Sequence, residues 1–193
     1  GFAPRWQIAV WIGFFTGMRP SEVLGLTWDR LDFENQEITI DRQLSRDSKK
    51  IFADHLKTSK SYRTIPFSPY LQKLLLEHRD QHGLGPHALI LQNRSGNVWR
   101  YKDASAMFRL IARPLGFDKG EGMHQLRHTC ASVLIKLGNN AKQIQEWLGH
   151  ESILETMDTY GHLFPRDLHE VSDRLDAYVV GQLEIQHEQR MLA

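Results

Sequence analysis

The stretch Leu148-Gly149-His150-Glu151-Ser152-Ile153-Leu154-Glu155-Thr156-Met157-Asp158-Thr159-Tyr160-Gly161-His162 places a tyrosine ten positions after a Gly-His pair. We expect one helix to end at Leu148 and another to run from Ile153 to Tyr160, so that His150 lies between them. A lone tyrosine late in a helix is usually a half-buried packing residue. The stretch therefore gains its meaning from the residues that precede it.

Three motifs stand upstream of this stretch. His124-Gln125-Leu126-Arg127-His128-Thr129 sets a histidine and an arginine one helical turn apart, so both can project from one face. Thr16-Gly17-Met18-Arg19-Pro20-Ser21-Glu22 contains an Arg-Pro pair, and Leu56-Lys57-Thr58-Ser59-Lys60-Ser61-Tyr62-Arg63-Thr64-Ile65-Pro66 contains two lysines before a predicted strand. Each motif alone occurs by chance in many proteins. Their order is what carries information.

An arginine, a lysine, a His-x-x-Arg pair, a histidine and a tyrosine in this order resemble the tyrosine recombinases of the phage integrase family, over Thr16 to Tyr160. The resemblance implies site-specific cleavage and rejoining of DNA through a 3′-phosphotyrosine intermediate and a Holliday junction. It implies a mainly α-helical catalytic domain with a small antiparallel β-sheet (α+β), without cofactor. The implied catalytic residues are Arg19, Lys57, His124, Arg127, His150 and the nucleophile Tyr160, with Glu22 in support.

Phosphodiester cleavage needs a nucleophile, stabilised phosphate oxygens and a proton for the leaving 5′ oxygen. Arg19 and Arg127 suit the second task, because a guanidinium stays charged and offers two parallel donors to phosphate. The resemblance implies that Lys57 donates the proton to the leaving 5′ oxygen, and Lys60 is the alternative candidate for this role. A phenol has a pKa near 10 and needs positive charge or a proton acceptor nearby. We expect the glycine before His150 to permit close approach to a backbone phosphate.

Plainer interpretations exist for several of these residues. Arg19 and Glu22 are spaced for an ordinary ion pair on a helix surface. His124 and His128 have the spacing of two zinc ligands, but no glutamate of a His-Glu-x-x-His motif and no cysteine pair accompanies them, so we expect no metal. We interpret His128 as a core or capping histidine.

Charge is distributed unevenly, although 24 basic and 23 acidic residues nearly cancel. Basic residues dominate 41–63 and 94–113, whereas acidic ones dominate after His150. This pattern favours a protein that binds phosphate on one face. The plainer interpretation is that these charges are ordinary solvated surface. The candidate DNA-binding residues are Arg42, Lys49, Lys50, Lys60, Arg63, Arg94 and Arg100.

Apolar spacing and turn residues predict the remaining elements. We expect a buried helix over 6–15 ending at Gly17, a short helix capped by Ser21, and strands at 38–40, 62–65 and near 51–52. Further helices are predicted over 69–83, 102–115, 124–137, 141–148, 153–160 and from Leu168 to about Ile185. The length favours a single domain over 1–193. The resemblance also implies N-terminal core-binding and arm-type domains, which do not fit within 193 residues.

The resemblance also implies partners. These are double-stranded DNA attachment sites, further copies of the chain in a tetramer on synapsed DNA, and an accessory DNA-bending or directionality protein, with a monomer expected for the isolated domain. The tail beyond His162 resembles a segment that packs on a neighbouring protomer. The segment 156–165 resembles integrases of phages and integrative elements. No apolar run approaches the roughly 18 residues of a membrane span, so we expect a cytoplasmic, nucleoid-associated protein. The rival functions are a type IB topoisomerase, which uses similar residues, and a non-catalytic DNA-binding module.

Overall fold

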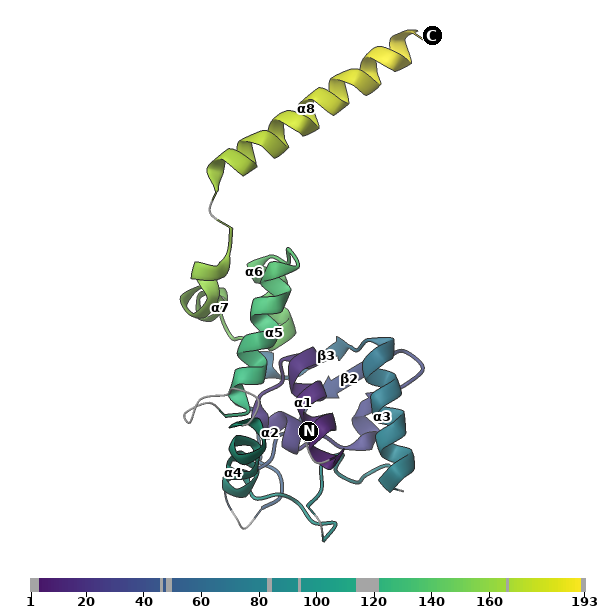
Figure 1. Cartoon of the computed structure of the whole chain (residues 1–193), viewed down its shortest axis with the longest axis vertical. Coiled ribbons are helices and arrows are strands. Elements are labelled where there is room, and N and C mark those ends of the chain that lie inside the picture. Colours follow the sequence, from purple (N-terminus) through teal and green to yellow (C-terminus); the bar gives the residue numbers. More distant parts are fainter. Residues whose placement is uncertain are drawn as a thin grey trace. The chain divides into compact units, whose positions relative to one another are not determined.

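The structure is a computed structural model that describes residues 4–45, 47, 50–82, 85–93, 95–113, 122–165 and 167–191. The chain forms two compact units, Gly1–Leu163 and Phe164–Ala193. Every candidate catalytic residue belongs to the first unit. The architecture is mainly α-helical with one small antiparallel sheet, which confirms the predicted fold class (Figure 1).

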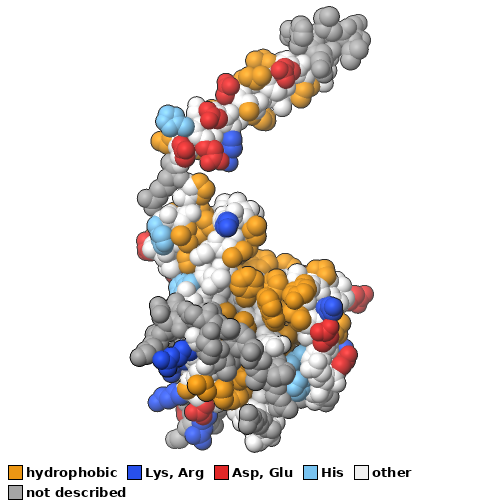
Figure 2. All heavy atoms as spheres, viewed as in Figure 1, with side chains coloured by type: hydrophobic (Ala, Val, Ile, Leu, Met, Phe, Trp, Pro, Cys, Tyr) orange, Lys and Arg blue, Asp and Glu red, His pale blue; other side chains and the backbone are white. Residues whose placement is uncertain are grey.

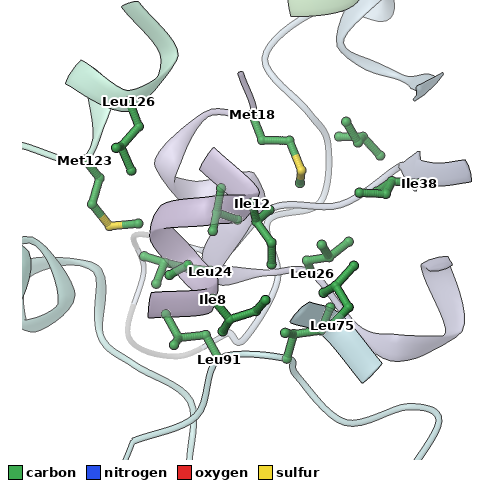
Figure 3. Packing of buried hydrophobic residues seen from close by; sticks show 14 of the residues in the cluster. Ile8, Ile12, Met18, Leu24, Leu26, Ile38, Leu75, Leu91, Met123 and Leu126 are labelled. Atoms are coloured by element: carbon green, nitrogen blue, oxygen red, sulfur yellow. The ribbon is translucent and has the colours of Figure 1, made fainter. Parts of the chain in front are cut away.

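Helix α1 (Pro4–Thr16) forms the middle of the first unit and contacts three other helices. These are α2 (Pro20–Leu24), α3 (Pro69–His82) and α5 (His124–Lys136). Ile8 and Ile12 of α1 are buried in one cluster with Leu24 and Leu91 (Figure 3). Each fully buried side chain of this size stabilises the fold by about 1.5–3 kcal/mol. The apolar sequence of α1 thus makes it the helix around which the unit packs.

The sheet comprises β1 (Leu31–Asp32), β2 (Glu37–Ile40) and β3 (Arg63–Pro66), paired antiparallel in that order. Ile38 pairs with Ile65, and both side chains are buried. Alternation along β2 buries Ile38 and Ile40 and leaves Glu37 and Thr39 exposed. The connection from β2 to β3 carries both candidate lysines.

The third strand was predicted in the wrong place. Residues near 51–52 form no strand, and Phe52 makes only an isolated bridge with Leu44. The third strand is instead β1, which turns into β2 after the Asp32 carboxylate accepts backbone N–H bonds from Glu34 and Asn35. Two residues are too few for any alternation to be visible in the sequence.

The predicted cap of α2 was also wrong. The helix begins at Pro20, whose fixed φ suits the first turn, and Arg19 occupies the N-cap position. Ser21 instead donates to Gln43 Oε1 at 3.1 Å. The backbone N–H of Arg19 donates to Glu22 Oε2 at 2.8 Å, so the carboxylate satisfies the donor that precedes the helix.

Two short helices next to the site begin and end as predicted, α6 (Ala141–Leu148) and α7 (Ile153–Tyr160). Asn140 caps the start of α6 and Ser152 the start of α7, each through a side-chain oxygen that accepts a backbone N–H. Gly149 ends α6 in the left-handed conformation. Helix α4 (Tyr101–Ala112) starts one residue before the prediction, and 114–121 lie outside the described residues.

The second unit consists mainly of α8 (Leu168–Met191), which extends past the predicted end near Ile185. Apolar side chains lie among acidic ones along its surface (Figure 2). Its exposed apolar residues include Leu168, Val171, Leu175, Tyr178, Val179, Leu183 and Ile185. Within the described residues, no helix combines the length and the apolar character that crossing a bilayer requires.

Candidate active site

A buried carboxylate on α2 binds two arginines. Glu22 is 1% exposed, and its carboxylate accepts from Arg19 Nη1 at 3.0 Å and from Arg63 Nη2 at 3.1 Å. Burial alone would raise the pKa of Glu22, but the charges and hydrogen bonds of Arg63 and Arg19 hold the pKa below its ordinary value. The pair of Arg19 and Glu22 is thus buried, not the surface pair that helical spacing alone suggests.

Arg63 directs its donors at protein oxygens. Its side chain is 7% exposed. Besides binding Glu22, Nη1 donates to the Ser61 carbonyl at 2.9 Å and Nε to the Trp147 carbonyl at 3.0 Å. These bonds join β3 to the end of α6. The geometry favours a positioning role for Arg63 over the DNA contact expected from its charge.

Gly149 packs against the same hairpin. A Cβ at this position would lie 2.9 Å from the Lys60 carbonyl oxygen and 2.9 Å from Arg63 Cδ, and φ is +68°. The Gly149 carbonyl accepts from Arg19 Nη2 at 3.2 Å. Gly149 therefore permits close approach of the hairpin residues Lys60 and Arg63. Its carbonyl also holds Arg19 next to His150.

Arg127 extends from α5 into the interior. It is 2% exposed, and Nη1 donates to the Gly17 carbonyl at 2.7 Å. Its buried Nη2 has no hydrogen-bond partner among the described residues. Burial, with the charge of Arg19, lowers the pKa of the guanidinium to about 9, so the group stays protonated at neutral pH. An unsatisfied buried donor costs about 1–3 kcal/mol.

Tyr160 is the last residue of α7 and is 4% exposed. Its hydroxyl lies 2.9 Å from His128 Nδ1. Its ring stacks on His150 with centroids 6.4 Å apart and planes 8° from parallel. His150 Nδ1 in turn bonds to Thr156 Oγ1 at 2.8 Å. The phenol therefore lies between one histidine that contacts its oxygen and another that covers its ring.

The histidines of the site favour the neutral form. Burial and the charge of Arg127 lower the pKa of His150 to about 4, against the opposing charge of Glu155. Partial burial of the ring, with His128 and Arg127 nearby, lowers the pKa of His124 to about 4, although the residue as a whole is exposed. Burial raises the pKa of Tyr160, and the charge of Arg127 only partly offsets this rise. In the free protein, burial therefore outweighs the charge of Arg127 in its effect on the pKa of the phenol.

The two candidate lysines line different cavities. Lys57 lines one of about 580 Å³ together with Arg19 and His124. Lys60 lines another, of about 480 Å³, with Gly149 and His150. Both lysines are exposed. Lys57 thus shares a cavity with one expected phosphate-binding arginine, and Lys60 does not.

Comparison with known proteins decides the family. Residues 4–166 match the phage integrase family. The chain belongs to this family. The ICEBs1 integrase of Bacillus subtilis is 28% identical over 86% of this chain, and a XerC-like tyrosine recombinase of Caldanaerobacter subterraneus is 31% identical over 80%. The family predicted from the motif order is confirmed.

A solved phage-integrase relative supports the same assignment. The Tn1549 transposon integrase, determined in complex with transposon right end DNA, matches 90% of this chain with a TM-score of 0.74 and 25% identity, and 58% of its own chain is covered. The chain spans about half the length of the curated relatives it matches, 47% of the ICEBs1 integrase and 45% of the XerC-like recombinase.

The residues expected to contact DNA in this integrase-family chain occupy varied settings. Lys50 and Arg100 line a cavity of about 810 Å³, and Arg100 is exposed. Lys50 also pairs with Asp54 at 2.7 Å. Arg42 lies over the Phe52 ring at 5.3 Å and bonds to Asp41. Lys49 and Arg94 lie outside the described residues.

Sequence reasoning missed three neighbours of the site. Ser61 accepts from Arg19 at 3.1 Å, Thr156 bonds to His150, and His128 contacts the nucleophile candidate itself. His128 is therefore more than the core or capping residue expected. The rings of His124 and His128 lie 5.0 Å apart, yet the described residues contain no group of three His, Cys, Asp or Glu side chains that could hold a metal ion.

Proposed function

We propose that this chain cleaves and rejoins DNA at specific sites, with Tyr160 attacking the scissile phosphate to form a 3′-phosphotyrosine. The observation that carries the proposal is that the buried Tyr160 lies within electrostatic reach of Arg127, whose Nη2 is buried without a partner among the described residues. A phosphate oxygen satisfies such a donor with a charge-assisted bond. Family membership supports the same chemistry.

In this proposal each residue has one task. Arg19 and Arg127 bind the non-bridging oxygens and stabilise the charge that develops during attack. Lys57 protonates the leaving 5′ oxygen, because it lines the cavity that contains Arg19 and His124. Neutral His124 and His150 donate hydrogen bonds to the phosphate, and Glu22 fixes Arg19. None of these tasks requires a bound metal.

Recombination is favoured over supercoil relaxation by the relatives described above, which are named integrases and recombinases. Recombination needs two DNA sites held by several copies of the protein, with an accessory DNA-bending or directionality protein as a further candidate partner. The apolar surface of α8 supports contact with a neighbouring copy, since isolated surface helices rarely expose so many large apolar residues. The place of action would be the nucleoid.

The DNA would lie along the surface that carries Lys50, Lys60 and Arg100. All three residues are exposed. Such lysines and arginines neutralise phosphates and make binding weaken as salt is added. Lys49 and Arg94 extend this proposed surface in sequence.

The test uses nicked duplexes drawn from the DNA that flanks the encoding gene. We expect a protein–DNA species that survives denaturing electrophoresis, with the adduct on the peptide that contains Tyr160. The matched control is Tyr160→Phe, which removes one oxygen. An adduct that persists in this variant, or that maps to Tyr62, Tyr101 or a serine, contradicts the proposal. Relaxation of any supercoiled plasmid without site preference would favour the topoisomerase instead.

A further inference from the structure

Two histidines contact Tyr160, and within the described structure only His128 is hydrogen bonded to its hydroxyl. The distance from His128 Nδ1 to the phenol oxygen is 2.9 Å. His150 stacks on the ring, and its Nδ1 is bonded to Thr156 while Nε2 faces the Glu155 carboxylate at 3.8 Å. His124 meets His128 edge to face at 5.0 Å. The contact with the reacting atom thus belongs to the residue after Arg127.

The setting of His128 suits a proton acceptor. Burial and the charge of Arg127 both lower the pKa of its ring, so the neutral form prevails at neutral pH. A neutral imidazole has one nitrogen that accepts a hydrogen bond. With Nδ1 unprotonated, the phenol donates its proton along the 2.9 Å contact. That geometry is within the reach that a general base requires.

We propose that His128 is the general base that accepts the Tyr160 proton as the phenol attacks phosphorus, an inference that rests on the proposed function. The phenolic O–H breaks and its proton moves to His128 Nδ1, while the Tyr160 oxygen bonds to phosphorus. The bond from phosphorus to the 5′ oxygen breaks, and that oxygen takes a proton from Lys57. When the strand is rejoined, His128 returns the proton to the departing Tyr160 oxygen.

The surroundings of the two groups determine how the transfer can proceed. The proton leaves a buried phenol whose pKa burial has raised, so cleavage is slow unless the proton has an acceptor. The charge of Arg127 favours the phenolate of Tyr160 but disfavours the imidazolium of His128, so the proton transfer must accompany the attack on phosphorus rather than precede it. General bases of this kind contribute typically about 10²–10⁴-fold in rate.

The experiment compares His128→Ala and His128→Gln with wild type in single-turnover cleavage of the nicked duplex. Glutamine can accept a hydrogen bond from the phenol but cannot take its proton, so it separates a base from a positioning residue. We expect both variants to cleave about 100-fold or more slowly. A His128→Gln rate close to wild type would reduce His128 to positioning and overturn the inference. Faster cleavage by His128→Ala would overturn it too.

A second substrate assigns the side of the reaction on which His128 acts. In a duplex with sulfur in place of the bridging 5′ oxygen, the leaving thiolate needs no proton. We expect this substrate to restore Lys57→Ala but neither His128 variant. Restoration of His128→Ala would move His128 to the leaving-group side and overturn the inference. If His128→Ala fails to fold by circular dichroism, His128→Gln carries the test.

Different results contradict the proposed function and the role of His128. Wild-type protein that forms no adduct at Tyr160 contradicts the proposed function, and the inference with it. Wild-type protein that forms the adduct while the His128 variants react equally fast contradicts the inference alone.

Discussion

Replacing Gly149 by alanine should destabilise the first unit by about 2–5 kcal/mol. Left-handed backbone costs a residue with a Cβ about 1–2 kcal/mol, and φ at Gly149 is +68°. The new Cβ would also lie 2.9 Å from the Lys60 carbonyl oxygen, a backbone atom that cannot swing away as a side chain can. Overpacking of this kind adds typically about 1–3 kcal/mol.

Gly138→Ala is the matched control. Gly138 follows α5 as Gly149 follows α6, with φ +86°, but nothing lies within 4 Å of its added Cβ. This variant should lose only the conformational contribution. The difference between the two variants, about 1–3 kcal/mol, therefore measures the packing of Gly149 against the hairpin.

Urea unfolding followed by tryptophan fluorescence measures both variants. All five tryptophans lie in the first unit, so the signal reports that unit. The slope against urea should stay constant while the midpoints shift. Cleavage by Gly149→Ala should fall as well, because the Gly149 carbonyl holds Arg19 at 3.2 Å. Equal losses in the two variants would contradict the packing contribution, since the hairpin would then move away from the new Cβ without a loss of stability.

Three other outcomes are expected. Arg127→Ala should slow cleavage by about 100-fold or more while retaining most DNA affinity, whereas Lys50→Ala should weaken binding and reduce its salt slope by about 1; equal loss of binding in both would contradict the distinction. Glu22→Gln should lower the free energy of unfolding by about 3–5 kcal/mol at neutral pH. Because the pKa of Glu22 is lowered in the folded protein, its carboxylate stabilises the fold above the ordinary value of 4.5, and this stabilisation is lost as pH falls through the folded pKa. The free energies of unfolding of variant and wild type, measured against pH, must therefore converge in acid. Cleavage should persist with excess chelator, and loss that magnesium or zinc reverses would show that the cationic side chains do not suffice.

Local signals explain what the sequence predicted well. Asn140, Gly149 and Ser152 mark the ends of α6 and α7 through hydrogen bonds made within a few residues, so both helices were predicted with their observed bounds. The motif order identified the family from residue types alone. Partners distant in the sequence were invisible to such reasoning. Arg63 bonds to Glu22 41 positions away, and His128 contacts Tyr160 across 32 positions, so neither role leaves a local pattern.

Hydrogen bonds of the candidate site join residues that are far apart in the sequence, and this determines when the site can form during folding. Arg19 contacts Gly149 across 130 positions, and Arg127 contacts Gly17 across 110. Contacts of such high sequence separation form only after most of the intervening chain has folded. We therefore expect that a nascent, truncated or partly unfolded chain lacks the contacts that position Arg19 and Arg127. On the proposed function, the ability to cleave DNA therefore arises only together with the complete fold.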